Sequence, residues 1–333
     1  HGNNKSEEEL MMAIQNKIGA IVVDNFSELE MVSTLATTME QEVPILLRMT
    51  PGVEAHTHEY ITTGQEDSKF GFDLMNGEVK QGIQLALDSK FIKLRGLHSH
   101  IGSQIFDVEG FTHAIQRVYT HLNAWKQEFN YSPEILNVGG GFGIAYTDQD
   151  EPKSIELFID TIVQTVINET KKYQLDIPEI WIEPGRSLVG EAGTTLYTIG
   201  TQKTIPNIRK YITVDGGMSD NVRPALYQAE YDAILANRAN QEAEEKVTVA
   251  GKLCESGDIL IRDIKLPVAK SGDVLAVFCT GAYGYSMASN YNRIPRPGVV
   301  FVEDGHDQLV IKRETYEDLL QYDLQLQTVT PQK

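Results

Sequence analysis

Two hydrophobic patterns alternate along the first 186 residues. In some segments apolar residues recur at helical spacing, and between them lie short runs of consecutive apolar residues typical of buried strands. The first helix is expected to begin at Ser6, with Glu9 as its capping-box partner. Further helices are expected near residues 27–39, 78–87, 111–129 and 155–167, and strands near residues 18–23, 43–49, 92–101, 135–138 and 180–182.

This alternation predicts an α/β fold with a parallel sheet covered by helices. Polar or glycine-rich clusters follow several strands, which is where a (β/α)8 barrel builds its active site. The predicted strands are fewer than the eight that a barrel needs. Either the sheet is open, or the first strands of a barrel lie upstream of His1.

The pattern changes after about residue 190. Short β-rich runs follow one another, separated by Asp-Gly, Ser-Gly and Pro-Gly turns, which predicts a mainly antiparallel β domain. We therefore expect a partial barrel over residues 1–190 and a C-terminal β domain over residues 191–333. The β-rich runs cover residues 194–201, 210–214, 246–250, 274–279, 299–302 and 308–312, and a helical turn is expected near 316–320.

Composition narrows the classes of function. The net charge of −18 would repel nucleic acid and anionic membrane surfaces, so neither is expected as a partner. No apolar run approaches the length of a membrane-spanning helix. The only cysteines are Cys254 and Cys279, too few for a disulfide framework, and a reduced, cytoplasmic setting is expected.

Three glycines, Gly139, Gly140 and Gly141, follow the predicted strand at 135–138. Without Cβ atoms, their backbone N–H groups could approach an anion such as a phosphate. We also expect a helix directly after them, whose N-terminus would favour negative charge. A tight strand-to-helix turn explains the same residues, and the two alternatives carry about equal weight.

A second cluster contains His98, His100 and Ser103. The two histidines share a face of the predicted strand, where a flat imidazole could stack on an aromatic cofactor and Ser103 could donate to a phosphate. Hydrogen-bonded core histidines are the plainer alternative. A zinc site is less favoured because no third ligand is obvious nearby.

The third cluster is Glu183-Pro184-Gly185-Arg186, at the end of a predicted strand. Its plain interpretation is a salt bridge. A carboxylate there could instead keep a pyridine nitrogen protonated, which makes the ring a better electron sink. The guanidinium of Arg186 suits a carboxylate or a phosphate.

Candidate residues in the second half lie in three motifs. Arg223 and Tyr227 are spaced to share a helical face and could together bind a substrate carboxylate. Cys254 lies beside Glu255, and a thiol there could donate a proton, although a buried structural cysteine is the alternative. Tyr283 lies in a glycine-flanked loop and could contact a phosphate.

Taken in order, these motifs resemble the alanine-racemase-like decarboxylases that use pyridoxal 5′-phosphate, and within them the diaminopimelate decarboxylases. The resemblance spans nearly the whole chain, and family members have a (β/α)8 barrel followed by a β domain. It implies decarboxylation of meso-2,6-diaminopimelate to L-lysine and carbon dioxide, in a homodimer with shared active sites. The segments that carry it are residues 1–6, 98–104, 139–143, 183–186, 215–227, 254–258 and 281–292.

The resemblance also implies a role for each candidate residue. Cys254, supplied by the other subunit, would reprotonate the carbon that loses carbon dioxide, and His100 would stack on the pyridine ring. Glu183 would pair with the pyridine nitrogen. The remaining cofactor-binding residues would be Ser103, Gly139, Gly140, Gly141, Gly185, Arg186 and Tyr283. The residues that bind the distal end of the substrate would be Arg186, Arg223, Tyr227, Glu255 and Tyr283.

The chain departs from the family pattern in two places. Gly251 is followed by Lys252 where the family has Gly-Pro, for which we expect only a local change. No segment matches the motif of the family's Schiff-base lysine, which lies on the first barrel strand. In the family, the motif at His1–Lys5 follows the third strand, so the chain is expected to start inside the barrel, with Lys5 as a structural residue.

Two alternative functions remain open. The chain could belong to a related decarboxylase acting on ornithine, arginine or carboxynorspermidine. The two arginines favour a distal carboxylate over the bare cation of ornithine or arginine, whereas carboxynorspermidine is harder to exclude. The chain could also be a non-catalytic regulatory relative, against which the intact motifs at Glu183–Arg186 and Cys254-Glu255 argue.

Overall fold

The computed structural model describes residues 1–53 and 68–325. The chain divides into two compact units, His1–Leu188 and Val189–Lys333. Each unit is described by itself below.

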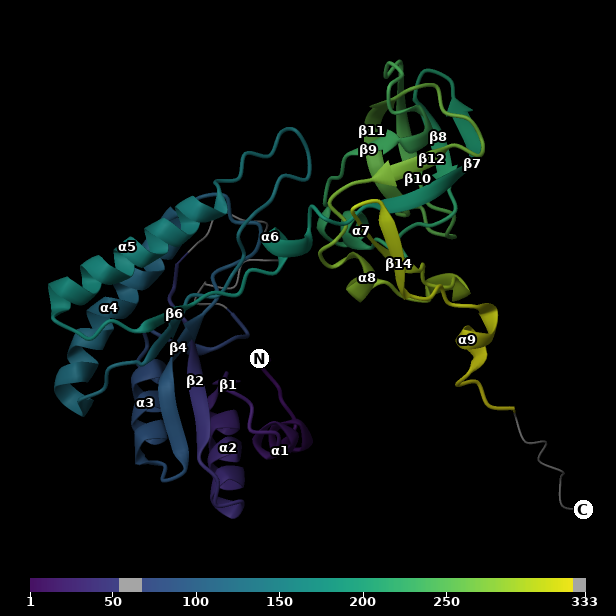
Figure 1. Cartoon of the computed structure of the whole chain (residues 1–333). Helices are drawn as coiled ribbons and strands as arrows, with labels where there is room; N and C mark the ends of the chain where they lie inside the picture. The colour runs from purple at the N-terminus through teal and green to yellow at the C-terminus, as the bar shows by residue number, and fades with distance from the viewer. Residues whose placement is uncertain (54–67, 326–333) are drawn as a thin grey trace, which may run out of the picture. The chain divides into compact units, whose positions relative to one another are not determined.

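A parallel sheet forms the centre of the first unit, as predicted (Figure 1). Its strands pair in the order β1-β2-β4-β5-β6, and the two-residue strand β3, which the sequence pattern did not predict, pairs with β2. Every pairing is parallel. The strands are β1 (Ile21–Val23), β2 (Val43–Thr50), β3 (Phe72–Asp73), β4 (Ile92–Ser99), β5 (Ile135–Asn137) and β6 (Glu179–Trp181).

Helices alternate with these strands, and several of them begin at residues that cap a helix N-terminus. The capping box of Ser6 and Glu9 starts α1 as predicted, and Asn25 and Ser154 cap α2 and α5 through their side chains. Helices α4 and α5 pack against each other (Figure 1). The helices are α1 (Glu7–Gln15), α2 (Phe26–Thr38), α3 (Glu78–Asp88), α4 (Glu109–Phe129), α5 (Ile155–Tyr173) and the single turn α6 (Arg186–Val189).

Three buried aromatic rings connect the helices to the glycine-rich loop after β5. Phe142 stacks on Phe111 of α4 at 5.3 Å and lies 5.2 Å from Phe158 of α5, between ring centroids. Truncating a buried phenylalanine costs about 3–5 kcal/mol of folding stability. The apolar core therefore fixes the far end of the loop that begins at Gly139.

The second unit is built on a sheet with the order β11-β10-β8-β7-β12-β9. The pair β8–β10 is parallel and the other pairs are antiparallel, in agreement with the predicted mainly antiparallel domain. Strands β9 and β11 were not predicted. The strands are β7 (Thr195–Ile205), β8 (Arg209–Val214), β9 (Ala233–Leu235), β10 (Glu245–Ala250), β11 (Ile259–Leu266) and β12 (Val274–Val277).

The remaining elements of this unit are short. Strands β13 (Val299–Glu303) and β14 (His306–Ile311) form a separate hairpin. The helical elements are α7 (Arg223–Tyr227), η2 (Ala236–Arg238), α8 (Gly284–Met287), η3 (Tyr291–Arg293) and α9 (Tyr316–Leu320), the last as predicted. Over the two described stretches of the chain, no helix has both the length and the apolar character required to cross a membrane.

Candidate active site

The carboxyl ends of three neighbouring strands carry the candidate residues of the first unit. His98 lies in β4 and His100 just beyond it, Asn137 ends β5, and Glu183 follows β6. Because the strands are parallel and adjacent, these ends meet at one edge of the sheet.

Glu183 is held through one oxygen only. Asn137 Nδ2 donates to its Oε1 at 2.8 Å, His1 Nε2 lies 2.8 Å from the same atom, and His98 Nε2 lies 3.3 Å from it. No other residue in the described part of the chain bonds to the Glu183 carboxylate, so its Oε2 is available to a ligand. The carboxylate is also about one-third exposed and therefore accessible.

The protonation states suit a carboxylate between neutral rings. Burial alone would raise the pKa of Glu183, but hydrogen bonds from His1 and His98 bring it far below its ordinary value. Burial lowers the pKa of His98, and burial together with the charge of Arg48 lowers the pKa of His100 to about 4. At neutral pH Glu183 is therefore ionised, and His98 and His100 are neutral.

The glycine-rich loop differs from the prediction in one respect. No helix follows it directly, because α5 begins only at Ile155, so the expected contribution of a helix N-terminus is wrong. The N–H of Gly139 donates to Asn137 Oδ1 at 2.9 Å, and the N–H of Gly140 to His100 Nδ1 at 3.3 Å. Within the described residues the N–H of Gly141 has no acceptor, and it is the donor left for an anion.

Close packing of loops explains why these positions are glycines. A Cβ on Gly140 would lie 2.0 Å from the carbonyl oxygen of Glu183, and one on Gly141 2.1 Å from that of Gly102. Both distances are shorter than non-bonded atoms can approach one another, so a side chain at either position would clash. Gly185, in contrast, has open space where its Cβ would be.

Ser103 and Arg186 meet beside this loop. Arg186 is buried and donates from Nη2 to Ser103 Oγ at 2.9 Å and from Nη1 to the hydroxyl of Tyr146. The expected alternative, a salt bridge with Glu183, does not form. Since Ser103 Oγ accepts from Arg186, its own hydrogen remains available to a ligand.

Backbone hydrogen bonds hold the Ser103 loop against the glycine loop. Ile105 N–H donates to Gly141 O at 2.8 Å, and Gly143 N–H donates to Ile105 O at 2.9 Å. The side chain of Gln104 adds bonds to the backbone of Ile144 in both directions. A hydroxyl, a backbone N–H and a guanidinium are thus gathered on adjoining loops, as a phosphate requires.

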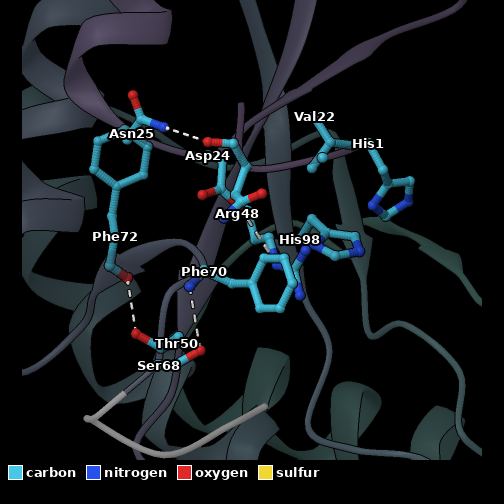
Figure 2. Close-up of polar contacts among 12 residues, drawn as sticks. His1, Val22, Asp24, Asn25, Arg48, Thr50, Ser68, Phe70, Phe72 and His98 are labelled. Atoms are coloured by element: carbon cyan, nitrogen blue, oxygen red, sulfur yellow. Dashed lines mark hydrogen bonds and ion pairs between the residues drawn. The ribbon is translucent and has the colours of Figure 1, made fainter. Parts of the chain in front are cut away.

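Sequence reasoning missed Arg48, at the end of β2. Figure 2 shows this arginine among Asp24, Phe70 and His98. Its Nε lies 3.9 Å from Asp24 Oδ1, and its guanidinium carbon lies 4.1 Å from the centroid of the Phe70 ring. A charged residue inside an otherwise apolar strand was the signal that could have identified it, because such residues are rarely buried without a partner.

His1 and Asn137 were also missed as partners of Glu183. His1 belongs to a segment used for the resemblance, and its ring meets that of His98 edge-on at 4.7 Å (Figure 2). Asn137 was counted only as the end of a strand. Neither contact is visible in the sequence, because the residues lie 182 and 46 positions from Glu183.

Lys5 has a structural environment. Its ammonium donates to Gly2 O and Val22 O at 2.8 Å each and to Glu28 Oε1 at 2.6 Å. These bonds use all three protons of the group. The amine is therefore not a nucleophile in this conformation.

In the second unit, Cys254 and Glu255 lie on an exposed turn between β10 and β11. The carboxylate of Glu255 accepts a hydrogen bond from the hydroxyl of Tyr291. The thiol is thus accessible rather than a buried structural cysteine. Tyr283, in the loop before α8, is 44% exposed and has a left-handed backbone conformation with φ of 62°.

Arg223 and Tyr227 are the first and last residues of α7. They are four residues apart on one helix, which is the predicted spacing. Arg223 is buried, and its Nη1 donates to the hydroxyl of Tyr231 at 2.6 Å. Tyr231 is a further residue of this cluster that the sequence pattern did not identify.

The residues of the first unit fit pyridoxal phosphate. Glu183 offers an ionised oxygen to a pyridine nitrogen, and His100 offers a neutral flat ring. Ser103, Gly141 and Arg186 offer donors to a phosphate. The fit rests on the available Oε2 of Glu183 and on the loop contacts that bring the phosphate donors together.

Comparison with known proteins agrees with this chemistry. The model of the pyridoxal binding domain of pyridoxal-dependent decarboxylases matches residues 1–190. The diaminopimelate decarboxylase of Bacillus subtilis (strain 168) is 58% identical over 328 residues, which are 98% of this chain and 75% of that protein.

Solved structures give the same result. Diaminopimelate decarboxylase from M. jannaschii in complex with L-lysine is 36% identical, with a TM-score of 0.91 over 98% of this chain and 74% of that one. The enzyme from Helicobacter pylori complexed with L-lysine is 31% identical, with a TM-score of 0.87 over 96% of this chain and 76% of that one. The predicted fold, part of a (β/α)8 barrel followed by a β domain, is confirmed.

Proposed function

The chain belongs to the pyridoxal-dependent decarboxylases, and on that premise we propose that it converts meso-2,6-diaminopimelate to L-lysine and carbon dioxide, as a carboxy-lyase. The observation that carries the proposal is the carboxylate of Glu183, fixed through Oε1 with Oε2 available. The choice of substrate rests on the similarity to diaminopimelate decarboxylases over 98% of the chain.

Pyridoxal phosphate, when bound, supplies an electron sink for the bond that breaks. Glu183 would keep the pyridine nitrogen protonated, and Asn137 and His1 hold Glu183 in its orientation. His100 would stack on the pyridine ring, and its Nδ1 accepts a hydrogen bond from the N–H of Gly140. By the resemblance to the family, the phosphate would be bound by Ser103, Gly141, Arg186 and Tyr283, and Gly139, Gly140 and Gly185 would shape the loops around it.

A metal ion is a poorer occupant of the same place. His1, His98 and Glu183 have ligand atoms within 4.8 Å of one another, which is close enough for a metal. However, Asn137 already donates to the Glu183 oxygen that faces both histidines. The positive charge of Arg48, which contributes to lowering the pKa of His98 and His100, also opposes a cation. A protonated ring nitrogen needs only the unused Oε2.

The distal end of the substrate is an amino acid, with a carboxylate and an amine. Arg186, Arg223, Tyr227 and Tyr283 would bind the carboxylate, and Glu255 would bind the amine. Anchoring this L-configured end presents the D-configured end to the cofactor. Cys254, whose thiol is exposed, would then donate a proton to the carbon that has lost carbon dioxide.

A substrate comparison tests the specificity. The holoenzyme should release carbon dioxide from meso-diaminopimelate with one L-lysine for each carbon dioxide. Ornithine, arginine and carboxynorspermidine are the matched alternatives. Comparable kcat/KM for any of them would refute the assignment, and absence of turnover with every substrate would favour the non-catalytic alternative.

We further propose a homodimer in which Cys254 and Glu255 complete the site of the other subunit. The hairpin of β13 and β14 supports an interface, because it exposes five apolar side chains that are each between 40% and 74% accessible. Val300, Val302 and Leu309 share one face of the hairpin, because Val300 pairs with Leu309 and strand residues alternate between faces, and an exposed apolar face favours an interaction site. The five residues are Val300, Phe301, Val302, Leu309 and Val310.

Complementation between two inactive variants tests the shared sites. Cys254→Ala and Glu183→Gln would be mixed in conditions of demonstrated subunit exchange. In a heterodimer, one site carries both defects and the other neither. Random exchange of equal amounts makes about half of the dimers heterodimers, each with one intact site in two, so roughly a quarter of full activity should return. Activity that stays at the level of the separate variants would contradict the cross-subunit role of Cys254.

A reduced compartment, the cytoplasm, fits an enzyme whose proton donor is an accessible free thiol.

A further inference from the structure

One buried carboxylate ties the turn that carries Cys254 and Glu255 to a second loop. Asp258 is only 2% exposed. Its Oδ2 accepts from the N–H of Leu253 at 2.9 Å, and its Oδ1 accepts from the N–H of Met218 at 2.7 Å. Leu253 directly precedes Cys254, whereas Met218 belongs to the loop that leads into α7 and Arg223.

Two glycines make room for this carboxylate. A Cβ on Gly251 would lie 2.1 Å from Asp258 Oδ2, and a Cβ on Gly217 would lie 2.5 Å from the same oxygen. Neither position can carry a side chain without displacing the carboxylate. The glycine that precedes Lys252 is thus required by Asp258, although the residue after it departs from the family pattern.

Backbone hydrogen bonds close the same arrangement. Lys252 N–H donates to Gly216 O at 3.0 Å, Gly251 N–H to Asp258 O at 2.9 Å, and Asp258 N–H to Glu255 O at 3.1 Å. Asp258 therefore bonds to both ends of the Cys254 turn and also joins this turn to the Gly216–Met218 loop. Its tip, with the thiol and the carboxylate of Glu255, is exposed.

We propose that Asp258 is a positioning residue for the decarboxylation, which fixes the Cys254 turn so that the thiol reaches only one face of the carbon that loses carbon dioxide. The inference rests on the proposed function. Asp258 itself is buried behind the turn and acts through the N–H groups that it accepts from. A side chain that acts in this way should influence the stereochemistry of protonation as well as the rate.

Deuterium labelling provides the test. When the holoenzyme acts on meso-diaminopimelate in D2O, the bond to the carboxylate is replaced by a bond to deuterium. The lysine formed then carries one deuterium at its terminal CH2 carbon. With the turn fixed, the wild-type product should have a single configuration at that carbon, which NMR of a chiral derivative can measure.

Asp258→Asn replaces one acceptor oxygen with an amide that cannot accept from an N–H. We expect kcat to fall roughly tenfold to a hundredfold, the scale for losing a hydrogen bond to a charged group, and the product to contain both configurations. Configuration is a property of each turnover and does not depend on how much protein is folded. If Asp258→Asn does not accumulate as folded protein, Gly251→Ala displaces the same carboxylate and should give the same mixture.

Asp220→Asn is the matched control. Asp220 is a second carboxylate on the same loop, which accepts from Gly217 N–H at 2.9 Å and from the hydroxyl of Tyr197, but not from the Cys254 turn. Its product should keep a single configuration. A single configuration in Asp258→Asn and Gly251→Ala would overturn the inference, as would a mixture from the wild type. No release of carbon dioxide by the wild type would instead refute the proposed function.

Discussion

The side-chain amide of Asn137, the last residue of β5, donates to Oε1 of Glu183 at 2.8 Å, just beyond the neighbouring strand β6. The bond fixes which oxygen of the carboxylate stays with the protein and which faces the site. Two adjacent strand ends thus set the direction of the carboxylate that we propose pairs with the pyridine nitrogen.

Asn137→Ala should weaken cofactor binding. Removal of one neutral donor from an ionised carboxylate costs about 1.4 kcal/mol, or roughly tenfold in the dissociation constant. Fluorescence titration of the apoenzyme with pyridoxal phosphate measures the change. Asn240→Ala, at an exposed position, is the control and should bind as the wild type does. Equal affinities for the two variants would contradict the role of Asn137.

The low pKa of His100 predicts a pH dependence of stability. The folded protein holds this imidazole neutral down to about pH 4, whereas an unfolded chain protonates it from about pH 6.5 downward. Between these values the unfolded state binds more protons, so the free energy of unfolding decreases as the pH falls.

His100→Asn should reduce that decrease, because asparagine keeps an acceptor for Gly140 and does not titrate. Urea unfolding of the apoprotein at pH 7 and pH 5 measures it, with His306→Asn on the exposed hairpin as control. If the pH dependence of His100→Asn equals that of the wild type, His100 does not carry the effect.

Two lysines allow a matched comparison of ion pairs. Lys5 and Glu28 are 12% and 4% exposed, and Lys5→Met leaves a buried carboxylate without its partner. We expect a loss of about 3–5 kcal/mol in the free energy of unfolding. Lys80 and Glu128 are each 48% exposed, so Lys80→Met should cost about 0–1 kcal/mol. Similar losses in denaturant titrations would contradict the structural role of Lys5.

Much of the fold could be predicted because the hydrophobic pattern is strong. The apolar run Val43–Met49 is buried along nearly all of its length, as expected of a parallel strand. Strand β3 was missed because two residues give no pattern. Strand β11 was missed because the segment Ile259–Leu266 alternates only in part between apolar and polar residues. A β-bulge in its pairing with β10 interrupts the alternation.

Only those residues of the candidate site that lie in recognisable sequence motifs could be predicted. Glu183, His100 and Ser103 lie in recognisable segments, and the structure brings them to one edge of the sheet with Gly141. The contacts of Arg48, Asn137 and Asp258 depend on pairing between distant segments, which the sequence does not reveal. The helix expected after Gly141 was wrong because an irregular stretch, tied to the Ser103 loop, lies between that glycine and Ile155.

Arg223→Ala should selectively impair the substrate with a distal carboxylate. Arg223 is buried, so removing its charge should cost about 2–4 kcal/mol in kcat/KM for meso-diaminopimelate, the scale for truncating a buried charge pair. Arg262→Ala, an exposed arginine on β11, is the control. Steady-state kinetics would contradict the assignment if both variants kept the wild-type kcat/KM.

The most direct measurement follows the carboxyl carbon. The holoenzyme would be given meso-diaminopimelate with carbon-13 only in the carboxylate of its D-configured end. The account predicts that all the label appears as carbon dioxide and that the lysine formed is unlabelled and of L configuration. Label retained in the lysine, or release of carbon dioxide without formation of lysine, would contradict it.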